Sequence, residues 1–299
     1  MSAVHKPVLL SETISSLNLQ PGQTIVDATF GSGGHAEEII KKISPCGHYI
    51  GIDIDNQAFD GKEIKINKKN KVEVSLINDN FSNISKILEE LNVNSIDAAM
   101  ADLGWRIEQF FSGGKGLSFL HDEPLLMTFG NPEKYSFTAE EIINSWSESV
   151  LSNIIFGYSE ERYARRIAKE IVNSRKKQKI ITTGDLVEVI EKSLPARAKN
   201  RKRHFATATF QALRIAVNDE FSVLEKFIND VFLSIKPGGH LSIISFHSLE
   251  DRIVKNLFKK FVSSNQAELL NRKPTTPTDD EIKINPRSRS SKLRTIIKI

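Results

Sequence analysis

Five residues, Gly31-Ser32-Gly33-Gly34-His35, form a glycine-rich turn that could hold a ligand against the backbone. Glycine lets the chain turn sharply and lets a ligand approach closely. A helix that starts after such a turn has free N–H groups, which suit a carboxylate or a phosphate. Asp53 follows 22 residues after Gly31 (53 − 31), where a carboxylate can accept hydrogen bonds from both hydroxyls of a ribose. The spacing predicts a ligand with a nucleoside part; a purely structural glycine turn is the alternative.

Two details of these segments favour S-adenosylmethionine over a dinucleotide. The string lacks the third glycine at the place where a dinucleotide fingerprint has it. The third expected strand also ends in Asn78-Asp79-Asn80-Phe81, which offers polar atoms and an aromatic face to an adenine. A nicotinamide-dependent dehydrogenase stays as a more remote alternative.

The elements that must position these residues alternate between strand and helix in the first third of the chain. Apolar runs and helical spacing predict strands at 24–30, 47–53, 72–77 and 96–101, with helices at 36–43 and 84–91. This alternation is typical of βαβ units around a parallel sheet with right-handed crossovers. The predicted fold class is therefore α/β, with a Rossmann-like sheet.

A long helical stretch interrupts this pattern. From Phe111 to Ala216 the sequence shows helical periodicity and no convincing strand, and Thr138 with Glu141 predicts a capping box. Further elements are expected as helices at 160–173, 183–194 and 206–235, strands at 239–246 and 292–299, and a proline-rich loop at 273–286. The chain is thus predicted to hold a ligand-binding domain of residues 1–110 and 217–299, with a helical domain of residues 111–216 inserted in it.

The charge distribution is more informative than the net charge. The 299 residues carry 41 Lys and Arg against 37 Asp and Glu, and a net charge of +4 is only a weak indication of a polyanionic partner. Two segments, 192–204 and 285–299, hold several basic residues and no acidic one. Each segment is either a solvated surface or a phosphate-binding surface.

The single cysteine, Cys46, excludes several kinds of site. It rules out an intramolecular disulfide and a multi-cysteine metal site, and it lies in a Ser-Pro-Cys-Gly turn that is unpromising for a nucleophile. We expect no metal. No long apolar run predicts a membrane span or a signal peptide, so a cytoplasmic protein is expected.

Several long strings of the chain occur in the same order in one known family. They are His5 to Leu10, Asp27 to His35, Gly51 to Asp53, Tyr158 to Ala164, Phe210 to Glu220, Ser245 to Arg252 and Asn285 to Arg287. On these strings the chain resembles the MraW-like methyltransferases, which modify N4 of a cytidine in bacterial 16S rRNA. The resemblance implies a class I methyltransferase sheet with an inserted helical substrate-recognition domain. It also implies S-adenosylmethionine as cofactor, 16S rRNA within the small ribosomal subunit as partner, no membrane, and a monomer or homodimer.

The resemblance assigns site residues by motif. Cofactor contacts are expected at Gly33, Gly34, His35, Asp53, Phe81, Asp102 and Gln109. Substrate contacts are expected at Trp105, Arg203, His204, Arg214 and His247. Trp105 departs from the family pattern and could either stack on a base or fill the pocket. Asp102, at the end of the fourth expected strand, is also the predicted catalytic residue, with the backbone carbonyls of the following loop as further acceptors, because an acceptor beside an exocyclic amine restores its nucleophilicity.

The chain departs from the family pattern in two segments, 105–129 and 204–208. Two small hydroxyl residues that follow Asp-Leu-Gly-Val in the family are Arg106 and Ile107 here, and two family arginines are Thr128 and Ala208. Both segments adjoin the expected target pocket. The leading hypothesis is an S-adenosylmethionine-dependent cytidine N4-methyltransferase; the alternatives are a cofactor-binding homologue with impaired catalysis and one with a re-specified substrate.

Overall fold

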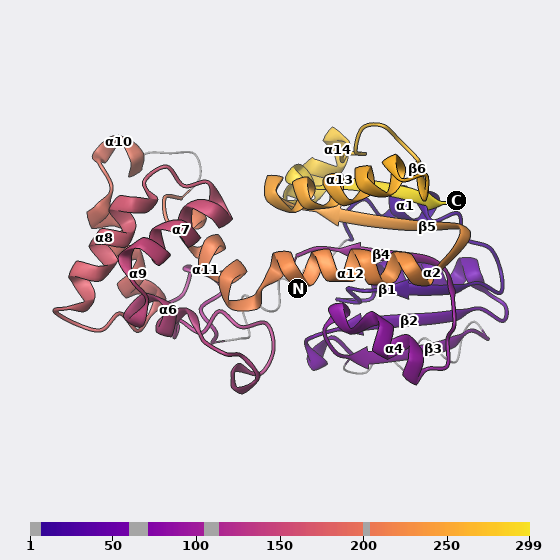
Figure 1. The fold of residues 1–299 in the computed structure, drawn as a ribbon, viewed down its shortest axis with the longest axis horizontal. Helices are drawn as coiled ribbons and strands as arrows, with labels where there is room; N and C mark the ends of the chain where they lie inside the picture. The colour runs from indigo at the N-terminus through magenta and orange to yellow at the C-terminus, as the bar shows by residue number, and fades with distance from the viewer. Residues whose placement is uncertain (1–6, 60–70, 105–113, 200–203) are drawn as a thin grey trace. The chain divides into compact units, whose positions relative to one another are not determined.

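The computed structural model describes residues 7–59, 71–104, 114–199 and 204–299. The chain divides into two compact units, one of residues 1–106 and 221–299 and the other of residues 107–220. The boundaries expected from the sequence, after residues 110 and 216, lie four residues away from these (110 − 106 and 220 − 216). Figure 1 shows a sheet with flanking helices in the first unit and a cluster of helices in the second.

A seven-stranded sheet forms the centre of the first unit. Its order is β3 (Glu73–Asn78), β2 (His48–Asp53), β1 (Thr24–Asp27), β4 (Ile96–Asp102), β5 (Ile235–Ser245), β7 (Lys292–Lys298) and β6 (Ala267–Leu269). The first five strands are parallel, and β7 runs antiparallel to both β5 and β6. The predicted α/β class with a Rossmann-like sheet is confirmed.

The order of the strands creates a site for a ligand. From β1 the chain proceeds to β2 and β3 on one side and later to β4 and β5 on the other, so the order reverses between β1 and β4. In open parallel sheets, ligands bind at such a switch point, outside the carboxyl ends of the strands. Residues that follow β1, β2 and β4 are therefore brought to one edge.

Helices cover both faces of this sheet. On one face α4 (Ile84–Glu90), α12 (Glu220–Ser234) and α13 (Ser248–Ser263) bury Ile87, Phe227 and Phe258 against the strands. On the other face α2 (Gly34–Ile43) buries Ile39 and Ile43, and α1 (Leu10–Ser16) lies next to it. The apolar side chains of these helices thus pack against both faces of the sheet and hold the strands that end at its carboxyl edge.

The described part of the second unit holds six α-helices, preceded by a largely irregular segment over residues 114–138. Its helices are α6 (Ala139–Ser145), α7 (Glu148–Ser159), α8 (Ala164–Arg175), α9 (Thr183–Ser193), α10 (Ala196–Lys199) and α11 (Thr207–Asn218). The only β pairing in its described residues is an isolated bridge between Pro124 and Thr182. The capping box is confirmed, since the Glu141 N–H donates to Thr138 Oγ1 at 3.3 Å and the Thr138 N–H donates to Glu141 Oε2 at 2.7 Å.

Three expected elements are wrong in detail. The helix expected at 206–235 is two helices, because Asp219 adopts a left-handed conformation with φ 47°. The helix expected at 160–173 begins only at Ala164, since Glu160 caps the preceding α7 with φ 55°. The loop expected at 273–286 contains α14 (Asp279–Ile284), where Thr278 Oγ1 accepts the Glu281 N–H and the first turn is acidic, as the helix dipole favours.

Within the described ranges, no helix has both the length and the apolar character needed to cross a membrane. The same ranges hold no group of three His, Cys, Asp or Glu side chains arranged to bind a metal ion.

Candidate functional site

The glycine turn joins β1 to α2 at the switch point of the sheet. Gly31 and Gly33 have φ values of 56° and 79°, a left-handed conformation that favours glycine. Gly33 is the N-cap of α2, and no side chain caps that helix. A Cβ atom on Gly34 would lie 2.2 Å from Cγ of Pro7, so the chain packs tightly there as well. The first turn of α2 is therefore held by backbone geometry and has no capping side chain over its amides.

Asp53 ties the end of β2 to this turn. Its Oδ2 accepts the Gly31 N–H at 2.9 Å, and its Oδ1 accepts the Asp55 N–H at 2.9 Å. These two hydrogen bonds hold the carboxylate at the end of β2, directly beside the glycine turn. This is the position in which the sequence predicts an acid that binds a ribose.

Phe81 lies beyond the end of β3, in the short helix η2 (Phe81–Asn83). Its ring packs edge-on against Phe227, with the centroids 5.0 Å apart. Asn80 Oδ1 accepts the Ser82 N–H at 2.9 Å, and Asn78 Nδ2 donates to the carbonyl of Asp53 at 3.0 Å. These bonds fix the segment after β3 against the end of β2, as an adenine site beside a ribose site requires.

Asp102 is the last residue of β4. Its carboxyl group is buried, and one of its oxygens lacks a hydrogen-bond partner among the described residues. Its N–H donates to Thr29 Oγ1 at 2.6 Å, whereas its Oδ1 has no hydrogen-bond partner among the described residues. Burial, with the negative charges of Asp27 and Glu250, raises the pKa of Asp102 well above its ordinary value of 3.8. A buried oxygen without a partner is rare in folded proteins, which makes Asp102 a candidate functional residue.

A second buried acid, Asp27, supports the turn from the end of β1. Tyr49 donates its hydroxyl to Asp27 Oδ2 at 2.7 Å, and the Thr29 N–H donates to Oδ1 at 3.1 Å. Burial raises the pKa of Asp27 to about 6, although the Tyr49 hydrogen bond lowers it. Sequence analysis did not select Asp27, because its partner Tyr49 lies on another strand.

The raised pKa of Asp27 predicts a pH-dependent stability. Between its ordinary value of 3.8 and about 6, the folded chain retains a proton that the unfolded chain has released. The retained proton stabilises the folded chain at low pH. As the pH rises through about 6, this contribution is lost and the free energy of unfolding falls by about 3 kcal/mol in total. Denaturant unfolding at pH 4 and pH 7 should therefore show the wild type losing stability relative to Asp27→Asn. An equal difference between the two proteins at both pH values would contradict the assignment.

The chain is similar over nearly its whole length to proteins of one known family. Residues 2–299 match the MraW methylase family. A ribosomal RNA small subunit methyltransferase H from Clostridioides difficile is 41% identical, with 99% of each chain covered. Proteins of the same name from Symbiobacterium thermophilum and Dictyoglomus thermophilum are 39% and 42% identical, over 100% and 98% of this chain and 98% and 96% of theirs.

The chain belongs to the MraW methylase family. The family expected from its strings of residues is confirmed, and with it an S-adenosylmethionine-dependent methyltransferase that modifies rRNA. The alternative of a homologue with impaired or re-specified catalysis is not favoured, because the match spans both departing segments. In this MraW methylase, Asp53 and Asp102 are hydrogen-bonded to the segment that follows β1, at Gly31 and Thr29, and Phe81 follows the next strand, β3.

Two predicted histidines have structural contacts. His35 is buried, and its Nε2 lies 3.2 Å from the Val8 carbonyl oxygen, so its ring packs against the chain before α1. His247 is the N-cap of α13: its Nδ1 accepts the Glu250 N–H at 3.3 Å, and its Nε2 lies 3.1 Å from Glu250 Oε1. His247 follows β5, the strand next to β4, and so stays at the carboxyl edge of the sheet.

The helical unit of this methylase holds two more of the predicted residues. The exposed His204 ring stacks on Phe119, with centroids 4.5 Å apart, and on Phe205 at 4.3 Å. Arg214 is buried and donates from Nε and Nη2 to the two carboxylate oxygens of Glu220, at 2.6 and 2.8 Å. Trp105, Arg203 and Gln109 lie outside the described residues.

The buried pair of Arg214 and Glu220 predicts a stability effect. Arg214→Ala would leave the Glu220 carboxylate buried without its bidentate partner, which costs about 3–5 kcal/mol. We expect a lower midpoint of thermal unfolding for this variant, and a similar loss for Glu220→Gln. If both variants unfold as the wild type does but transfer methyl groups poorly, Arg214 acts on the substrate instead.

Asn218 holds one of the departing segments in place and was missed by sequence analysis. Its Oδ1 accepts the Phe129 N–H at 2.9 Å, and its Nδ2 donates to the carbonyls of Met127 and Arg214 at 2.8 Å. Thr128, which replaces a family arginine, is fully buried in this segment. The only available signal was the position of Asn218 within the string Phe210 to Glu220.

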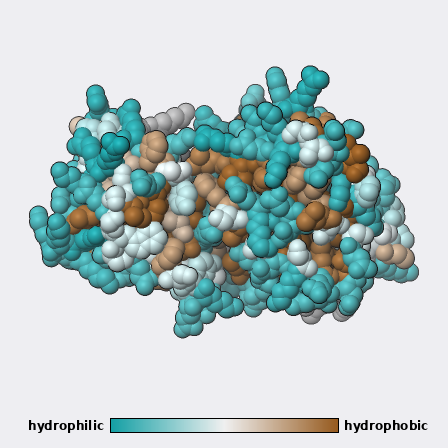
Figure 2. Space-filling model, viewed as in Figure 1, coloured by the Kyte–Doolittle hydropathy of each residue, from teal (hydrophilic) through white to brown (hydrophobic). Residues whose placement is uncertain are grey.

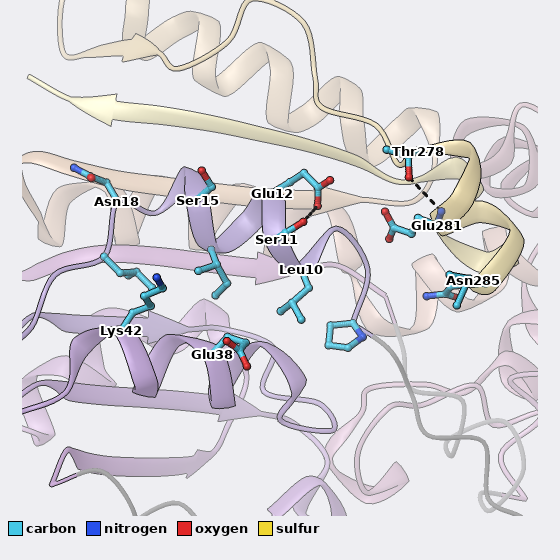
Figure 3. A pocket seen from close by; sticks show the side chains of 14 residues that line it. Leu10, Ser11, Glu12, Ser15, Asn18, Glu38, Lys42, Thr278, Glu281 and Asn285 are labelled. Atoms are coloured by element: carbon cyan, nitrogen blue, oxygen red, sulfur yellow. Dashed lines mark hydrogen bonds between the residues drawn. The ribbon is translucent and has the colours of Figure 1, made fainter.

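A cavity of about 990 Å³ lies between α1, α2 and α14 (Figure 3), and Pro7, which packs against Gly34, is among the residues that line it. Three glutamates, Glu12, Glu38 and Glu281, line it together with Lys42 and several apolar side chains. Glu281 Oε1 also accepts the Leu9 N–H at 2.8 Å. None of the predicted cofactor residues lines this cavity.

Proposed function

We propose that this chain transfers the methyl group of S-adenosylmethionine to the N4 amine of a cytidine in 16S rRNA within the small ribosomal subunit. The match to the MraW methylase family over residues 2–299 carries this proposal. Relatives at about 40% identity, named ribosomal RNA small subunit methyltransferase H, support the rRNA substrate. The proposed substrate implies a cytoplasmic enzyme.

The residues at the carboxyl edge fit S-adenosylmethionine. Its ribose hydroxyls match the acceptor capacity of Asp53, and its carboxylate matches the first turn of α2, which no side chain caps. The unpartnered Oδ1 of Asp102 offers an acceptor to a positively charged ligand. When bound, the cofactor supplies an activated methyl group on a sulfonium ion that becomes a neutral sulfide.

In this proposal each cofactor residue has its own task. Gly33 and Gly34 let the ligand approach the backbone, and Asp53 holds the ribose. The ring of Phe81 contacts the adenine. The ring of His35 contacts the Val8 carbonyl, so the proposed contact of His35 with the cofactor is made by its backbone in the first turn of α2. Gln109 is assigned by resemblance alone.

The target amine needs a base because its lone pair is delocalised into the cytosine ring. A hydrogen-bond acceptor held at the amine restores nucleophilicity and removes the proton after methylation. Asp102 is the proposed acceptor in its ionised form, and a nearby positive charge favours that form. The cytidine must leave its stack to reach this edge. Substrate contacts by Trp105, Arg203, His204, Arg214 and His247 are part of the proposal.

Methyl transfer to a defined substrate tests the function. Small subunits that lack the modification are incubated with protein and S-adenosylmethionine labelled in the methyl group, and the rRNA is then digested to nucleosides. The proposal expects label in N4-methylcytidine from 16S rRNA and none with fully modified subunits. Label in another nucleoside, or none at all while the cofactor binds, would contradict it.

A further inference from the structure

One face of α8 in the helical unit is strongly basic. Ala164, Ile167, Ala168 and Ile171 are buried and define the inner face of this helix. The opposite side and the turn that follows carry five exposed basic residues, Arg165, Arg166, Lys169, Lys176 and Lys177, called here the α8 cationic face. Helical spacing brings these five to one side, and the surface where Figure 1 places α8 is largely hydrophilic in Figure 2.

These five cations have no acidic partners. Within the described part of the chain, no carboxylate oxygen lies within 4.0 Å of any of them. Other basic residues of the same unit are paired: Lys179 with Glu140, Lys192 with Glu188 and Lys199 with Glu191, at 2.5–3.2 Å. Part of the basic segment 192–204, noted in the sequence, is thus neutralised, whereas the α8 cationic face is not.

The placement of two of the arginines opposes helix stability. Arg165 and Arg166 lie in the first turn of α8, which has no acidic residue. The amino end of a helix carries partial positive charge and favours acidic side chains, so two cations there are unfavourable. Within the described chain these cations have no carboxylate within 4.0 Å, so an external anion can pair with them.

We propose that the α8 cationic face binds the phosphate backbone of the rRNA. This inference rests on the proposed function and adds a contact surface to it. From Arg165 to Lys177 the helix and its last turn span about 18 Å, at 1.5 Å per residue, which reaches several phosphates of one strand. Phosphate contacts anchor and orient the protein without reading sequence, which leaves recognition of the target cytidine to other residues.

The triple variant Arg165→Glu, Arg166→Glu, Lys169→Glu tests this assignment. We expect KM for unmodified small subunits to rise at least about tenfold with kcat and the Kd of S-adenosylmethionine unchanged. The slope of log binding constant against log salt should fall by about 2, since each lost phosphate contact removes about 0.7–0.9. The thermal midpoint should stay the same or rise, because acids suit the first turn of α8.

The matched control is Lys255→Glu, Lys259→Glu, Lys260→Glu, which makes the same charge change on exposed residues of α13. An equal rise in KM for both triple variants would show an effect of net charge and overturn the proposal. A second result would also overturn the proposal. If the α8 variant binds deproteinised 16S rRNA as the wild type does but binds whole subunits weakly, the partner of the α8 cationic face is a ribosomal protein. Direct binding of the wild type to 16S rRNA is measured separately, so absent methyl transfer would contradict the proposed function and leave this test intact.

Discussion

Replacing Asp102 by alanine is expected to lower kcat for methyl transfer to unmodified small subunits by about 10²- to 10⁴-fold, the usual contribution of a positioned general base. The variant removes a carboxyl group whose Oδ1 has no partner in the described chain, so folding loses little by the change. Rapid-quench measurement of one turnover gives the rate of the chemical step directly.

The pH profile separates the base from a merely structural group. Burial and the charges of Asp27 and Glu250 raise the pKa of Asp102 well above 3.8, so the acceptor form is present only above that raised pKa. At S-adenosylmethionine concentrations far below its KM, where the rate reports the free enzyme, activity should therefore rise with pH through an ionisation above the ordinary range of an aspartate. This step should be absent from the residual activity of Asp102→Asn. A profile that is the same in both proteins would contradict the role of Asp102.

Asp97→Ala is the matched control for this prediction. Asp97 lies on the same strand, β4, near its amino end, where it accepts the Thr24 N–H and pairs with Lys236, both at 2.8 Å. Its loss should lower stability and leave the rate of one turnover unchanged.

The second large effect is expected for Asp53→Ala, which should raise the Kd of S-adenosylmethionine by about 10²- to 10⁴-fold. Two hydrogen bonds from ribose hydroxyls to a carboxylate contribute about 1.5–3 kcal/mol each. The variant also loses the hydrogen bond from the Gly31 N–H to Asp53, so the turn itself is less well ordered. Titration calorimetry measures the affinity, and circular dichroism checks that the variant is folded.

Glu73→Ala provides the control for Asp53. Its side chain is 73% exposed at the amino end of β3, at the opposite edge of the sheet from Asp53. The charge change is identical, and the Kd should change less than about threefold. If Glu73→Ala weakens binding as much as Asp53→Ala does, the effect is one of net charge and Asp53 does not hold the ribose.

The parts of the site that follow from local rules could be predicted from the sequence. The glycines at 31 and 33 have positive φ, and Asp53 ends a strand next to them, because apolar runs and glycine spacing encode those features directly. The partner of Asp27 could not be predicted in this way. Tyr49 reaches it from a neighbouring strand, and the hydrogen bond exists only once β1 and β2 pair.

The partners of charged side chains were harder to predict from the sequence than the helices and strands that follow from apolar spacing. Arg214 was expected to contact the substrate, and the sequence did not indicate that its guanidinium also pairs with Glu220, which follows the break in the helix at Asp219. The α8 cationic face was overlooked because Glu170 interrupts it in the sequence. Its five basic residues come to one side only once α8 has formed.

A crystal structure of the protein with S-adenosylhomocysteine, the demethylated cofactor, would show where the cofactor binds. The ligand is expected over the turn Gly31 to Gly34, with its ribose hydroxyls on Asp53 and its adenine against Phe81, at the carboxyl edge of β1, β2 and β4. Density for the ligand in the cavity between α1, α2 and α14, with none over the glycine turn and Asp53, would contradict this assignment.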